Sequence, residues 1–195
     1  MCRLALLLPL LWIAGCVQSL QPFYTDDQLT FDPAITGRWV DVEGKNALEI
    51  PAADADVLGK VYHVTHTDEK GKAGRYVVHL AKVDKYMLAD VKPEELQTGD
   101  SEQFTAQFLP VHTFFIVEIT ADELRVRPMS YDWFSKYIKA HPTELAFEQL
   151  EGDRIVLTAP TEKLQAFVVK NIDTPEAFAA ASVLRRGKPT TAPSK

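Results

Sequence analysis

The sequence predicts a mainly β fold with some α-helix (α+β), in which an antiparallel meander forms a barrel-like or strongly curved sheet. Three observations predict it. Segments rich in β-branched and aromatic residues follow one another through the middle of the chain, turn signals separate several of them, and helical patterns begin only in the C-terminal third. Short connections favour antiparallel pairing, because parallel neighbours require long crossover connections.

The expected strands lie between residues 37 and 127. Alternation is visible where Tyr76, Val78 and Leu80 share one face of a strand. Turn residues at 43–46 and 68–74 separate neighbouring strands. The expected strands are 37–43, 47–50, 60–67, 75–83, 86–91, 108–120 and 123–127.

Two or three short helices are expected after these strands. Ser130 can cap a first helix that Pro142 ends, and Thr161 can cap a second helix after an intervening hairpin. The triplet 174–176, Thr-Pro-Glu, has the composition of a third helix start, with a cap followed by proline and an acid. A closing strand over 181–186 is the alternative interpretation of that last segment.

The N-terminus has the three parts of a bacterial secretory signal. Arg3 precedes an apolar stretch at 4–13, which is shorter than the roughly twenty residues that a membrane-spanning helix requires. Ile13-Ala14-Gly15-Cys16 then resembles the lipobox of bacterial lipoproteins. The resemblance implies that the signal is cleaved before Cys16, and that Cys16 carries a thioether-linked diacylglycerol and an additional acyl chain. Such an anchor binds a membrane stably.

The lipobox also implies a location and a domain organisation. Val17, rather than aspartate, follows the cysteine, and in Gram-negative bacteria this resemblance implies an outer-membrane lipoprotein that faces the periplasm. We expect a signal peptide at 1–15, a lipidated tether at 16–33, a single β-rich domain at 34–186 and a disordered tail at 187–195.

Charge and cysteine content exclude several classes of protein. The net charge is −6, and no stripe of lysine and arginine is available to bind nucleic acid. Cys2 leaves with the signal and Cys16 is lipidated, so no disulfide is expected. Apart from the covalent lipid, the sequence predicts no cofactor. The lipid anchor is the expected contact with the membrane.

Gly37-Arg38-Trp39 opens the first expected strand and resembles the first sequence signature of lipocalins. The resemblance implies that Trp39 closes one end of a barrel beneath a ligand cavity. It also implies that a late arginine, Arg185 or Arg186, packs over the tryptophan. Aromatic residues are then candidates for the cavity lining, although they can equally fill a solid core. The candidate lining residues are Trp39, Tyr62, Tyr76 and Phe114.

No catalytic or metal-binding residues are predicted. The motifs of common hydrolases, nucleotide-binding proteins and zinc proteases do not occur, and an enzyme would require His112 beside an acid and a nucleophile. His63 and His79 are expected to be cross-strand neighbours but lack a third metal ligand. The first hypothesis is therefore a non-catalytic interaction or maintenance protein of the bacterial cell envelope. The alternative is a lipocalin-like binding module for a small apolar ligand.

Overall fold

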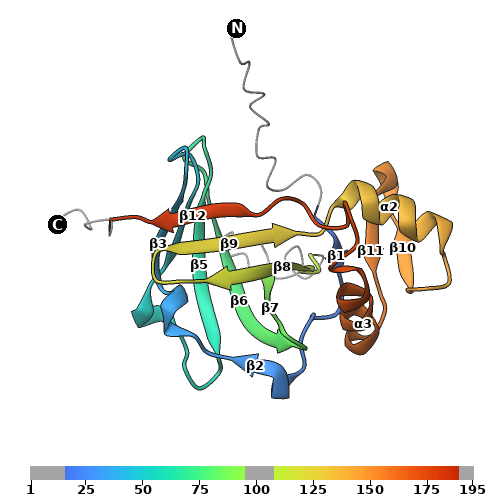
Figure 1. The fold of residues 1–195 in the computed structure, drawn as a ribbon, viewed down its shortest axis with the longest axis horizontal. Helices are drawn as coiled ribbons and strands as arrows, with labels where there is room; N and C mark the ends of the chain where they lie inside the picture. Colours follow the sequence, from blue (N-terminus) through green and yellow to red (C-terminus); the bar gives the residue numbers. More distant parts are fainter. Residues whose placement is uncertain (1–15, 95–107, 189–195) are drawn as a thin grey trace, which may run out of the picture.

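The computed structural model describes residues 16–94 and 108–188 and is mainly β, with an eight-stranded antiparallel barrel (Figure 1). The barrel closes because β12 pairs with both β3 and β9, while β9 also pairs with β8. Its strands are β3 (Gly37–Asp41), β4 (Ala47–Ile50), β5 (Val61–Thr67), β6 (Ala73–Val83), β7 (Tyr86–Pro93), β8 (His112–Ile119), β9 (Glu123–Pro128) and β12 (Ser182–Arg186).

The expected antiparallel sheet is confirmed, and its alternation sets which side chains enter the barrel. Tyr76, Val78 and Leu80 of β6 lie with the side chains of the barrel interior. In the β5–β6 hairpin, His63 pairs with Val77, and His79 pairs with Val61. The two histidines are therefore diagonal neighbours rather than a directly opposed pair.

Two α-helices and a small hairpin lie beside the barrel (Figure 1). Ser130 caps the first helix, because its Oγ accepts a hydrogen bond of 3.3 Å from the Trp133 amide. None of the helices in the described residues is long and apolar enough to cross a membrane. The elements are α2 (Tyr131–Ala140), β10 (Phe147–Gln149), β11 (Ile155–Leu157) and α3 (Thr161–Asn171).

The third helix start expected at 174–176 does not lead to a helix. Glu176 has a positive φ of 66°, which is incompatible with continuing a right-handed helix. The last part of the segment, Ser182–Arg186, forms β12 instead, in agreement with the alternative interpretation. The conformation of this segment is therefore determined by its pairing with two barrel strands and not by the local helix-start signal.

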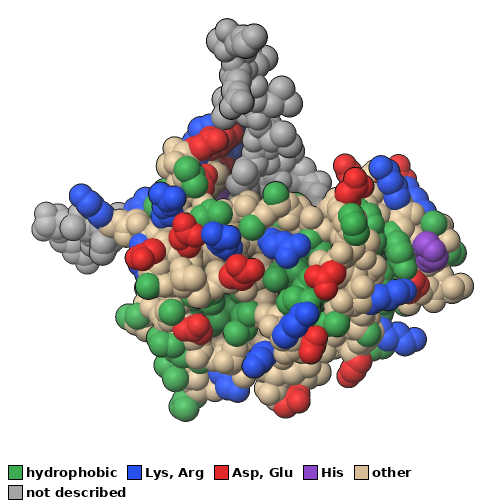
Figure 2. Space-filling view, viewed as in Figure 1, with side chains coloured by type: hydrophobic (Ala, Val, Ile, Leu, Met, Phe, Trp, Pro, Cys, Tyr) green, Lys and Arg blue, Asp and Glu red, His purple; other side chains and the backbone are tan. Residues whose placement is uncertain are grey.

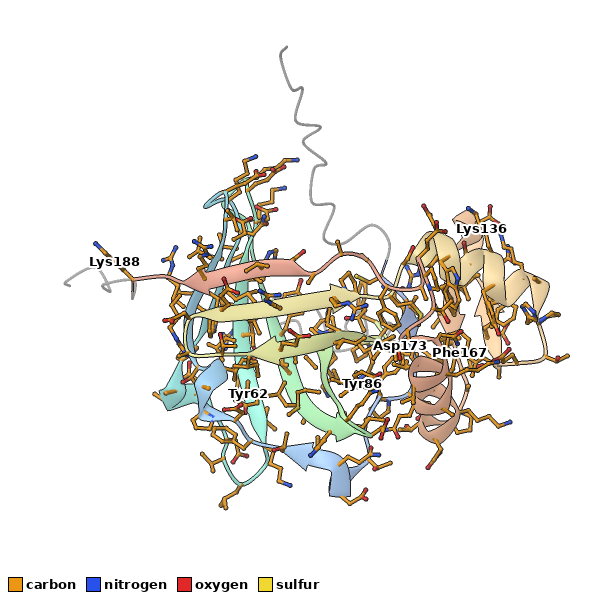
Figure 3. The ribbon with its side chains drawn as sticks, viewed as in Figure 1. Tyr62, Tyr86, Lys136, Phe167, Asp173 and Lys188 are labelled. Carbon is orange, nitrogen blue, oxygen red and sulfur yellow. The ribbon has the colours of Figure 1, made fainter. Side chains whose placement is uncertain are left out.

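The hydrophobic core has two parts. One lies inside the barrel, and the other lies between the outer face of the barrel and the helices. Phe134 and Ile138 of α2 are fully buried in the outer core, where Phe167 of α3 also packs (Figure 3). Tyr86 of β7 adds a polar link, since its hydroxyl donates a hydrogen bond of 3.5 Å to Asp173.

Residues 16–33, which were predicted to be a tether, pack against the barrel. Val17 and Phe23 are buried in the outer core, and Ser19 is fully buried. This segment is therefore part of the globular domain. Its strands are β1 (Gln18–Ser19), which lies between β8 and β11, and β2 (Leu29–Thr30), which pairs with β6.

Short 3₁₀ helices occur in the connections between these elements. They are η1 (Asp26–Gln28), η2 (Pro33–Ile35), η3 (Ala52–Asp54) and η4 (Glu151–Asp153). The predicted signal peptide and most of the predicted tail fall on 1–15 and 189–195, which lie outside the described residues.

Asp90 holds the N-terminal segment on the barrel. It is 1% exposed, and its Oδ2 accepts a hydrogen bond of 2.8 Å from the Phe23 amide. Its Oδ1 lies 2.7 Å from His112 Nδ1. One buried carboxylate thus links β7 to β8 and to the segment that crosses over both strands.

Replacing Asp90 by alanine is expected to lower the free energy of unfolding by about 2–3 kcal/mol, because the buried Phe23 amide and the partly buried His112 ring lose their partner. Urea unfolding measures this loss. Asp90→Asn is the control, because an amide oxygen still accepts the Phe23 hydrogen bond. An alanine variant as stable as the asparagine variant would show that these hydrogen bonds contribute little.

Candidate ligand cavity

The barrel encloses a cavity of about 290 Å³. Its wall comes from the inward faces of β4 to β9 and is mostly aliphatic. The volume lies close to the lower limit of about 300–1,000 Å³ that is typical of small-molecule sites. Central wall residues are Val64, Val78, Ala89, Val117, Leu124 and Val126.

Trp39 and Arg186 close one end of the barrel. Trp39 is fully buried, and its indole N–H donates a hydrogen bond of 2.7 Å to the Ile35 carbonyl. The Arg186 guanidinium lies 4.3 Å from the centre of the tryptophan ring, in the geometry of a cation–π contact. Arg186 also donates to the carbonyl oxygens of Ala121, Thr36 and Ala34. It therefore joins the end of β12 to the β8–β9 turn and to the segment before β3.

Gly37 permits this close approach. Its φ of 117° is unfavourable for residues that carry a side chain, and a Cβ atom there would lie 2.9 Å from Arg186 Nη1. The Gly-x-Trp spacing therefore has a direct physical reason in this barrel. Because Gly37 has no side chain, the guanidinium of Arg186 can pass it and pack on Trp39, which follows the glycine by two residues.

The opposite end of the cavity, which we call its mouth because Trp39 closes the other end, is lined by Cys16, Gln18, His66, Tyr76 and Thr113. Gln18 pairs with Thr113 across β1 and β8, so both side chains lie on the cavity side of the sheet. Cys16 precedes Gln18 by two residues and lies on the same side, while Val17 between them enters the outer core.

The described residues that line the cavity include no aspartate, glutamate, lysine or arginine. Burial lowers the pKa of His66 and raises the pKa of the Cys16 thiol, so both side chains remain uncharged near neutral pH. Gln18 Oε1 is buried and accepts no hydrogen bond from the described part of the chain. The cavity is thus apolar along its length and has uncharged polar groups at the mouth.

The four residues predicted to line the cavity lie in different places in the structure. Tyr76 lines the cavity, and Trp39 lies at its closed end. Tyr62 is fully buried in the barrel core (Figure 3), where it stacks on Phe31 and its hydroxyl bonds to the Asp32 backbone. Phe114 lies on the outer face of the barrel and packs against Phe23, with ring centres 4.3 Å apart.

Sequence reasoning missed most of the wall, because it considered aromatic residues as the lining. The alternation that identified Tyr76 and Val78 was the available signal for aliphatic wall residues on the other strands. No comparable signal identifies Gln18, because β1 contains only two residues.

His112 and Asp90 do not line the cavity. Together with His79 they lie on the outer face of β6, β7 and β8, beneath the N-terminal segment. Ser19 pairs with His112 across β1 and β8, but it is fully buried and its Oγ accepts a hydrogen bond from the Gln21 amide. These groups hold the segment in place.

His79 is expected to make stability depend on pH. Burial lowers its pKa, while Asp90, Asp26, Lys92 and His112 add smaller electrostatic effects. As pH falls below about 6.5, the unfolded chain therefore takes up a proton before the folded chain does. The free energy of unfolding should be highest above that pH and should decrease below it.

Urea unfolding of the wild type and of His79→Gln between about pH 7.5 and about pH 5.5 measures this dependence. The variant should lose less stability on acidification than the wild type. Equal losses in the two proteins would show that His79 does not contribute.

The surface shows no concentration of basic side chains on the face in Figure 2, where acidic and basic residues are interspersed. Groups of three or more residues suited to hold a metal ion do not occur among residues 16–94 and 108–188. Comparison of the chain with protein-family models, curated proteins and solved structures finds no match.

Proposed function

We propose that this protein is a lipocalin-like binding module that holds a small apolar ligand inside its barrel. The observation that carries the proposal is the aliphatic cavity of about 290 Å³, closed at one end by Trp39. Burying the apolar part of a ligand in such a cavity is favourable in proportion to the area removed from water.

The arrangement of Gly37, Trp39 and Arg186 supports this function. The lipocalin resemblance implied that a late arginine packs over the tryptophan, and Arg186 lies 4.3 Å from its ring centre. The first and last strands of the barrel are joined at this contact. The resemblance therefore extends from a short sequence pattern to three residues that are together in space.

The cavity favours the binding module over the interaction protein that was the first hypothesis. A solid core was expected for that hypothesis, together with an exposed apolar patch around Trp133. Trp133 is instead half-buried, and it stacks on Tyr137 and packs near Phe167.

We further propose that Cys16 carries the lipid anchor, and that the protein belongs to the periplasmic face of the bacterial outer membrane. The lipobox Ile13-Ala14-Gly15-Cys16 supports this part of the proposal. Under this hypothesis the membrane is a partner through the lipid, and the bound apolar molecule is the second partner.

Native mass spectrometry of the chain from Val17 onward, followed by solvent extraction, tests the binding function. A copurified apolar molecule, or uptake of one component from an added lipid mixture, is the expected result. A mass that remains that of the chain alone after exposure to the mixture would contradict the proposal.

A further inference from the structure

The predicted anchor residue is part of the mouth of the cavity. Cys16 and Gln18 lie on the cavity side of β1, and β1 is held on both edges by β8 and β11. Two residues of chain extend at most about 7 Å. A lipid on Cys16 would therefore keep the mouth next to the surface of the membrane that holds the lipid.

The segment after Cys16 is unable to act as a spacer while the domain is folded. Val17 is 3% exposed in the outer core, and the Phe23 amide is bonded to Asp90. Extending this segment would expose apolar side chains and break buried hydrogen bonds. The orientation of the mouth is thus coupled to the position of the anchor.

Apolar side chains are exposed near the same end of the barrel. Phe108 is 52% exposed and Leu109 is 70% exposed, and both precede Val111, which lines the cavity. Side chains of this kind can enter the boundary between lipid head groups and acyl chains. We expect them to make a second contact with a membrane beside the predicted anchor.

The lining also restricts the chemistry of the ligand. Bringing a charged head group into a mouth whose described lining residues carry no charge is costly, whereas a hydroxyl can donate to the buried Gln18 Oε1. The small volume favours one acyl chain over two. A single-chain lipid with an uncharged, hydroxyl-bearing head group satisfies both conditions.

We propose that the mouth faces the membrane that carries the Cys16 anchor, and that the cavity takes up a single-chain lipid of the monoacylglycerol type directly from that membrane. This inference rests on the proposed function, because it requires a cavity that binds ligands. It adds the class of ligand and the route by which the ligand enters.

The experiment compares the lipidated chain, bound to phosphatidylcholine vesicles, with the chain that lacks residues 1–15 and carries Cys16→Ser. Both proteins carry Trp133→Phe, so that Trp39 at the closed end is the remaining tryptophan once the signal is gone. The vesicles contain a monoacylglycerol with a brominated acyl chain, which quenches tryptophan fluorescence on close approach. The rate of Trp39 quenching reports transfer into the cavity.

We expect both proteins to be quenched, and the lipidated chain to be quenched at least about tenfold faster, because its mouth lies at the membrane. The double variant Phe108→Ser with Leu109→Ser should lower the rate of Trp39 quenching in the lipidated chain. It should leave the equilibrium quenching of the lipid-free chain unchanged. The control is Leu58→Ser, which alters a 96% exposed side chain between β4 and β5, at the other end of the barrel. It should change neither measurement.

Equal rates for the two proteins would contradict the membrane-facing mouth while leaving the binding function intact. Quenching of the lipid-free chain alone would show that an acyl chain on Cys16 fills the cavity, which would also overturn the inference. Stronger binding of an ionised brominated fatty acid than of the monoacylglycerol would overturn the assignment of ligand class. Absence of quenching in both proteins would overturn the ligand class and the route of entry, and the mass-spectrometric test of the proposed function then decides whether the cavity binds another apolar molecule.

Discussion

Replacing Trp39 by alanine is expected to lower the free energy of unfolding by about 3–5 kcal/mol. The indole is fully buried, and it contributes both a hydrogen bond to Ile35 and the surface on which Arg186 packs. Its removal leaves a void at the closed end and deprives the guanidinium of its aromatic partner. Urea unfolding followed by circular dichroism measures the change without depending on tryptophan fluorescence.

Two further variants separate the contributions at this end of the barrel. Trp39→Phe keeps an aromatic ring and should cost less than Trp39→Ala. Arg186→Lys retains the charge but loses the planar fork that donates to Thr36 and Ala34, so we expect a loss of about 1–3 kcal/mol. A Trp39→Ala variant destabilised by less than about 1 kcal/mol would contradict the central role of this contact.

Replacing Ala89 by phenylalanine is expected to weaken ligand binding at least about 100-fold, which corresponds to about 2.7 kcal/mol. Ala89 belongs to the middle of the cavity wall and is 5% exposed. The larger ring would occupy space that the ligand requires. Titration of the lipid-free chain with the copurified molecule, or with a monoacylglycerol, gives the dissociation constants.

The matched control is Val42→Phe, which adds the same ring at a position that is 71% exposed and does not line the cavity. It should bind like the wild type. Urea unfolding of Ala89→Phe checks that the barrel remains folded. A folded Ala89→Phe variant with unchanged affinity would show that the ligand binds outside the barrel.

Local patterns in the sequence predicted most of the barrel, since strand alternation and turn residues are local properties. They left 174–186 open between a helix and a closing strand, because a helix-start signal competes there with strand pairing to β3 and β9. They also did not predict β1, because two residues contain no periodicity and their pairing with β8 and β11 is determined by the tertiary structure.

The candidate site was predicted in part. Gly37 and Trp39 identified the closed end, and the lipocalin resemblance narrowed the packing partner to Arg185 or Arg186. Phe114 was placed in the lining, whereas the adjacent Phe115 lines the cavity. Side chains alternate across a strand, so the register alone decides between two neighbouring phenylalanines.

The central claim is that the barrel interior binds an apolar chain. The most direct test is an equilibrium titration of the lipid-free Trp133→Phe chain with a brominated monoacylglycerol, with Trp39 emission as the signal. Binding in the cavity predicts saturable quenching that Ala89→Phe abolishes and Val42→Phe preserves. Quenching that is absent, or that persists in Ala89→Phe, would contradict the claim.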